Sequence, residues 1–79
     1  MIDTIIIDKF LNEMQRLFNL NGRQLKQDTR LIEDLYATPF HYSEMISAIS
    51  QMTGKTVSFG DISECKTMGE VIDLLESFA

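Results

Sequence analysis

Residues 38–54, with the sequence TPFHYSEMISAISQMTG, mark out a helix by its two ends. Thr38 is an accepted N-cap, and Pro39 suits the first helical position because the amide that proline lacks would have no partner there. Gly54 tolerates the left-handed conformation in which many helices end. Apolar residues recur between these limits at Phe40, Met45, Ile46, Ala48, Ile49 and Met52. We therefore predict a helix that begins at Pro39 and stops at Gly54.

The chain before this helix carries another amphipathic pattern, from about Ile2 to Leu20. Asp3 or Thr4 can cap its start, and Asn21-Gly22 can end it because both residues tolerate left-handed backbone. Its apolar residues recur at the spacing of one helix face; they are Ile7, Phe10, Leu11, Met14, Leu17 and Phe18. The pattern predicts a first helix over about residues 2–20.

Residues 23–37 lie between the two predicted helices and show no sustained periodicity. We predict a long loop with one or two short turns. Its apolar residues are expected to reach the core; they are Leu25, Leu31, Ile32 and Leu35. A loop of this length in a small domain is often functional.

The C-terminal part of the chain begins with an extended connector at residues 55–60, and a brief helical turn is expected over Asp61–Cys65. Thr67-Met68-Gly69-Glu70 has the form of a capping box, so the last helix is predicted to begin after Thr67. Its apolar face consists of Met68, Val71, Ile72, Leu74, Leu75 and Phe78. The whole chain is thus predicted to be an all-α bundle of three main helices and one short helix.

The composition and net charge of the chain argue against several classes of function. The chain has 79 residues and 44% hydrophobic residues, which fits a single domain over residues 1–79 with one modest core. Its net charge of −5 argues against a nucleic-acid partner. One cysteine and one histidine exclude a disulfide framework and the usual zinc ligand sets. The longest apolar run, Ile5-Ile6-Ile7, is too short for membrane insertion and lacks the basic flank of a signal peptide, so we expect a cytoplasmic protein.

Three segments resemble the acyl carrier protein family, whose members carry acyl or peptidyl intermediates on a phosphopantetheine arm. The segment before the predicted second helix resembles the family's Glu-Asp-Leu motif and reads Leu31-Ile32-Glu33-Asp34-Leu35-Tyr36-Ala37. Glu44-Met45 and Ala48-Ile49 resemble pairs in the family's second helix, and Thr67-Met68 followed by residues 71–75 resembles its last helix. The match runs without gaps from about Leu31 to Leu75. It implies a small bundle with a long loop between the first and second helices.

The resemblance fails at the residue that defines the family's chemistry. In these proteins the arm is attached to a serine in Asp-Ser-Leu at the start of the second helix, where free amides favour a phosphate. The corresponding residues here are Thr38-Pro39-Phe40, and Pro39 has no hydroxyl. Tyr36 replaces the usual glycine, and His41 replaces an acidic residue found in many members. No cofactor is therefore expected at Pro39, and no catalysis, since no nucleophile–base pair is evident either.

Two functions remain open within the resemblance. The first is a non-catalytic protein-binding module, with Tyr36, Phe40, His41 and Glu44 presented to a synthase or acyltransferase of fatty-acid, polyketide or peptide-synthetase chemistry. The second is a working carrier with a relocated attachment residue, for which Ser43 is the main candidate because it lies one turn beyond Pro39. An unrelated helical domain that matches by chance is a further alternative. A monomer is expected in each case.

Individual side chains leave further alternatives. The hydroxyl of Thr38 is expected to be engaged as the helix cap, and Cys65 is expected to be a buried structural thiol. Phe40 either closes the end of the bundle or joins Tyr36 and Tyr42 in an exposed aromatic patch.

Overall fold

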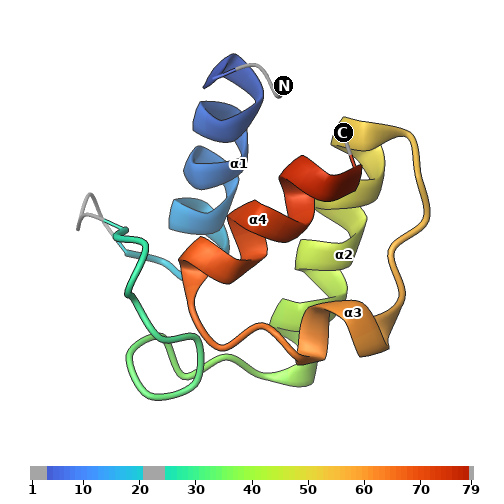
Figure 1. Cartoon of the computed structure of the whole chain (residues 1–79). Coiled ribbons are helices and arrows are strands. Elements are labelled where there is room, and N and C mark those ends of the chain that lie inside the picture. Colours follow the sequence, from blue (N-terminus) through green and yellow to red (C-terminus); the bar gives the residue numbers. More distant parts are fainter. Residues whose placement is uncertain (1–3, 21–24, 79) are drawn as a thin grey trace.

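The computed structural model describes residues 4–20 and 25–78, which form four helices and no strand. The helices are α1 (Thr4–Leu17), α2 (Pro39–Thr53), α3 (Phe59–Ser63) and α4 (Met68–Phe78). Helices α1 and α2 run in opposite directions, α4 crosses in front of them, and the short α3 lies near the start of α2 (Figure 1). Helix α2 packs against each of the other three. The predicted all-α bundle of three main helices and one short helix is confirmed.

Both ends of α2 form as the sequence predicts. Thr38 has extended backbone, and its Oγ1 accepts a hydrogen bond from the His41 amide at 3.4 Å. The His41 side chain completes a capping box, because its Nδ1 accepts from the Thr38 amide at 2.9 Å. Gly54 ends the helix with a φ of 72°, and its amide donates to the Ser50 carbonyl at 2.8 Å.

Two of the other three predicted helix ranges need correction. Helix α1 ends at Leu17 rather than Leu20, because Asn19 adopts left-handed backbone with a φ of 56°. The predicted cap Asp3 and the predicted stop Asn21-Gly22 lie outside the described residues. Helix α3 begins two residues earlier than the predicted Asp61–Cys65 turn, because Ser58 caps it.

The cap of α3 is a reciprocal pair. The Asp61 amide donates to Ser58 Oγ at 3.1 Å, and the Asp61 carboxylate accepts from the Ser58 amide at 3.3 Å. The predicted cap of α4 is present as well, since the Glu70 amide donates to Thr67 Oγ1 at 3.2 Å. Three of the four helices therefore start at a Ser or Thr whose side chain accepts from the backbone three residues later.

The core lies where α1, α2 and α4 meet, with α3 and the loops adding single residues. Its largest fully buried side chains are Phe10, Met14, Leu31, Met45, Ile49, Ile62, Met68, Leu75 and Val71. Cys65 is buried, as predicted. Its burial raises the pKa of its thiol to about 11, and nearby carboxylates add to this shift. Cys65 is therefore an uncharged part of the core at neutral pH.

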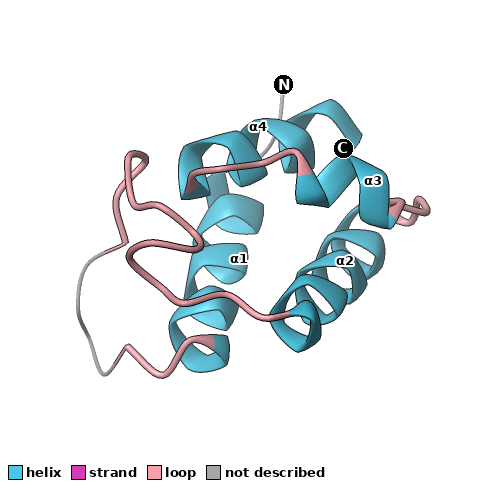
Figure 2. Ribbon diagram, turned by 90° about the horizontal axis from the view of Figure 1, so that it is seen from below, coloured by secondary structure: helices cyan, strands magenta, loops and turns pink. Residues whose placement is uncertain are grey.

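The loop between α1 and α2 is fixed to the start of α4 by three backbone hydrogen bonds. The Leu31 amide donates to the Lys66 carbonyl at 2.9 Å, and the Met68 amide donates to the Thr29 carbonyl at 2.8 Å. The Gly69 amide donates to the Gln27 carbonyl at 2.9 Å. Seen from below, the loop then crosses to the start of α2 (Figure 2). This attachment places residues 30–38 at one end of the bundle.

The loop contributes fewer apolar residues to the core than predicted. Leu31 is fully buried, and Leu25 and Leu35 pack against the core at intermediate burial. Ile32 is 60% exposed, so its predicted core position is wrong. The backbone at Leu31 is held against α4, and with Leu31 facing the core Ile32 is left at the surface.

Candidate functional site

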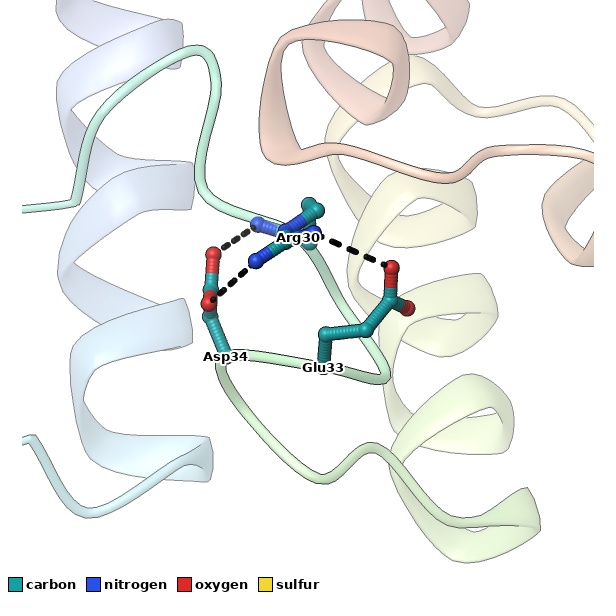
Figure 3. A network of polar contacts seen from close by, with 3 residues as sticks. All are labelled: Arg30, Glu33 and Asp34. Atoms are coloured by element: carbon teal, nitrogen blue, oxygen red, sulfur yellow. Dashed lines mark hydrogen bonds and ion pairs between the residues drawn. The ribbon is translucent and has the colours of Figure 1, made fainter.

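The candidate site begins with a tight turn over residues 30–36 that ion pairs hold together. The Arg30 amide donates to Asp34 Oδ2 at 2.8 Å, and the Arg30 guanidinium lies 3.5 Å from Asp34 Oδ1 and 3.6 Å from Glu33 Oε2 (Figure 3). The backbone hydrogen bond from Arg30 is the main reason why the pKa of Asp34 lies below its usual value. Asp34 therefore stays ionised and keeps the turn closed at neutral pH.

Tyr36 leaves this turn with left-handed backbone. Its φ is 55°, and its amide donates to the Ile32 carbonyl at 3.1 Å. This conformation costs a residue with a Cβ about 1–2 kcal/mol, whereas glycine adopts it freely. The Tyr36 side chain recovers little of this cost by packing, because the residue is 77% exposed. Tyr36 also stands where the acyl carrier proteins that the sequence resembles usually have glycine.

The other aromatic residues near this turn divide into exposed and buried ones. Phe40 is 63% exposed, so the interpretation that it closes the end of the bundle is wrong. Tyr42 is only 8% exposed and packs edge-on against Phe59, with ring centroids 6.0 Å apart. Tyr42 therefore does not join Tyr36 and Phe40 in an exposed patch. Ile32, which was predicted to lie in the core, is exposed on this turn and adds an apolar side chain to Tyr36 and Phe40.

His41, a predicted partner residue, packs at the start of α2. Its Nδ1 accepts from the Thr38 amide, and its ring lies over Phe18 at a centroid distance of 4.5 Å. The half-buried ring therefore ties the start of α2 to the end of α1. Phe40 lies edge-on to the same ring at 5.9 Å. His41 positions Phe40 and offers little free surface of its own.

Glu44 lies one turn after Phe40 on the same face of α2. Its exposed side chain lines a groove of about 370 Å³ between α1 and α2, whose floor includes Met14, Leu17 and Ala48. Within the described ranges Glu44 makes no ion pair. The four sequence-predicted partner residues thus lie around the start of α2, with Tyr36 on the loop and Glu44 toward the groove.

The start of α2 lacks the groups that would hold a phosphopantetheine arm. Pro39 provides neither a hydroxyl nor an amide hydrogen. The His41 amide already donates to Thr38 Oγ1, and the Tyr42 amide donates to the Thr38 carbonyl at 3.1 Å. The Thr38 hydroxyl lies 3.1 Å from His41 Nδ1, so it is engaged as predicted. Pro39 therefore offers no attachment atom, and the His41 and Tyr42 amides are already engaged with Thr38, so these residues do not fit the group.

Ser43 is exposed on α2, in the second turn of the helix. A hydroxyl there is reachable from solvent but stands away from the helix start, where amides are available to a phosphate. The geometry thus offers Ser43 as a surface hydroxyl without a phosphate-binding surround.

Neither a metal site nor a membrane-spanning helix is found among the described residues. Among residues 4–20 and 25–78, no cluster of three or more His, Cys, Asp and Glu side chains is placed to hold a metal ion. In the same part of the chain, no helix has the length and apolar character needed to cross a membrane.

Comparisons with known proteins add no assignment. No protein-family model, no curated protein and no solved structure matches this chain. The resemblance to acyl carrier proteins rests on the residues of Leu31–Leu75.

Proposed function

We propose that this chain is an acyl-carrier-protein-like domain that carries no phosphopantetheine arm and acts as a non-catalytic protein-binding module. The observation that carries the proposal is Tyr36, an exposed aromatic residue held in left-handed backbone. Strained residues persist at sites of function, and a large exposed aromatic side chain is typical of protein contacts. Glycine would satisfy the backbone here at lower cost, so the tyrosine ring has a role outside the fold.

The contact surface in this proposal consists of Tyr36, Phe40 and Glu44, extended by Ile32 on the turn. His41 contributes by fixing the start of α2 beneath Phe40. Glu44 is the only acidic residue on α2, so apolar contact rather than charge would dominate recognition. The partner would be a synthase or acyltransferase of fatty-acid, polyketide or peptide-synthetase chemistry.

The absence of an arm is the part of the proposal that can be tested without knowing the partner. The pure protein is incubated with coenzyme A and a broad-range phosphopantetheinyl transferase, and its intact mass is measured. A genuine acyl carrier protein serves as the positive control. We expect the mass of the wild-type chain to stay unchanged.

Two variants make this experiment decisive. A mass increase of one arm in the wild type, lost in Ser43→Ala, would establish the alternative of a working carrier with a relocated attachment residue. Modification of Pro39→Ser but not of the wild type would show that the missing hydroxyl is what prevents attachment. If neither is modified, the transferase does not recognise this surface, which agrees with its scarcity of acidic residues.

A further inference from the structure

A cavity lies next to the proposed contact surface, with which it shares Ile32, between the 30–33 turn, α2 and the connection from α3 to α4. Its volume of about 540 Å³ falls within the range typical of small-molecule sites. Apolar and sulfur-bearing walls come from Ile32, Tyr42 and Cys65, and charged groups at the surface come from Arg30, Glu33, Lys66 and Glu70. None of Tyr36, Phe40 and Glu44 contributes to it.

Tyr42 is the residue that makes this cavity a candidate binding site. The residue is 8% exposed, and its hydroxyl makes no hydrogen bond to another described residue. No polar side-chain atom in the described ranges is both shut off from solvent and unpaired, so the Tyr42 hydroxyl is open to solvent, and the Tyr42 side chain lines the cavity. A ligand in the cavity can therefore compete with water for this hydroxyl.

The charges around the opening favour one class of ligand. Arg30 is occupied by Glu33 and Asp34, and Glu70 is hydrogen-bonded to Thr67. Lys66 makes no ion pair in the described part of the chain, so its ammonium is a free cation at the opening. A ligand with several negative charges would be repelled by Glu33, Glu70 and the net charge of −5. A cationic ligand would meet Lys66.

We propose that this cavity binds a small organic monocarboxylate with an apolar body. The carboxylate accepts a hydrogen bond from the Tyr42 hydroxyl and pairs with Lys66, and the body packs against Ile32 and Cys65. Binding is non-covalent and leaves the Cys65 thiol protonated. This inference does not depend on the proposed function: the cavity shares Ile32 with the contact surface, but Tyr42 and Lys66, which would bind the carboxylate, belong neither to that surface nor to an attachment site.

The first test compares ligands of one shape and different charge. Phenylacetate, its neutral amide and phenethylamine are each titrated into the full ¹⁵N-labelled chain, with hexanoate as an aliphatic carboxylate. We expect saturable shifts of the amides that line the cavity with both carboxylates, at least about tenfold weaker binding of the amide, and none of the amine. Binding of the amine as tight as that of phenylacetate, or no saturable shift with either carboxylate at millimolar concentration, would overturn the proposal.

The second test assigns the binding to the two residues. Tyr42→Phe removes the hydroxyl and keeps the ring that packs on Phe59, and Lys66→Gln removes the cation. Each is expected to weaken phenylacetate binding about tenfold, while the exposed control Lys55→Gln leaves it unchanged. Melting curves of the variants verify that they fold. If Tyr42→Phe binds as tightly as the wild type, the hydroxyl is not a ligand contact and the proposal fails.

Discussion

The free-energy cost of the left-handed backbone at Tyr36 can be measured directly with two variants. Tyr36→Ala removes the ring but keeps a Cβ at a φ of 55°, whereas Tyr36→Gly removes both the ring and the strain. The left-handed conformation costs a residue with a Cβ about 1–2 kcal/mol, and the greater freedom of glycine in the unfolded chain offsets about 0.4–1 kcal/mol. We therefore expect the glycine variant to be more stable than the alanine variant by about 1 kcal/mol.

Thermal and urea unfolding measure this difference, which corresponds to a melting temperature about 4–8 °C higher for the glycine variant. Because Tyr36 is largely exposed, the glycine variant should also be at least as stable as the wild type. Two outcomes would refute the reasoning: equal stability of the two variants, or a loss of more than about 2 kcal/mol in both, the scale of a buried-residue defect.

Two controls separate backbone strain from other effects. Asn19 has a φ of 56°, but asparagine tolerates this region, so Asn19→Gly should change stability little. Gly54 has a φ of 72° and open space where a Cβ would lie, so Gly54→Ala should destabilise by about 1 kcal/mol through the backbone alone, after the same offset from the unfolded chain.

Other consequences of the fold are testable in the same unfolding assays. Gly69→Ala would place a Cβ 2.8 Å from the Gln27 carbonyl oxygen, so we expect a loss of about 1–3 kcal/mol and faster hydrogen exchange in the loop attached there; unchanged stability would contradict the close approach. Thr38→Ala removes the side-chain acceptor at the start of α2 and should cost about 1 kcal/mol, whereas a neutral result would mean that the cap contributes nothing. Cys65 binds its proton more tightly when folded, with a pKa of about 11 against 9.0, so its contribution is fully present below pH 9 and is lost as the pH rises toward 11. Stability should therefore fall over that range, less steeply in Cys65→Ala; identical slopes would place the effect elsewhere.

The sequence predicts those parts of the fold that local chemistry determines. Thr38, Pro39 and Gly54 act through their own backbone preferences, so the bounds of α2 could be predicted from their identity alone. The end of α1 could not, because Asn19 and Asn21-Gly22 are both suitable left-handed stops and sequence alone does not choose between them. The Ser58–Asp61 capping box is a local signal that the sequence does contain, and it would have placed α3 correctly.

The candidate site depends more on tertiary packing and was predicted less completely. Ile32 is apolar and follows the fully buried Leu31, and only the attachment of the loop to α4 determines which of the two faces the core. Tyr42 is polar at its tip, and its burial follows from the packing of α3 against α2. By contrast, the engaged hydroxyl of Thr38 follows from helix capping, and this prediction is confirmed.

The proposed contact surface can be tested most directly by site-specific photo-crosslinking in the native cell. A photoreactive phenylalanine derivative is placed at position 36 or 40, and at the exposed position 55 as a control. The account predicts that positions 36 and 40 give the same discrete cross-linked protein and that position 55 does not. Cross-linking of the same species from position 55, or none from positions 36 and 40, would contradict the claim that this end of the bundle binds a protein partner.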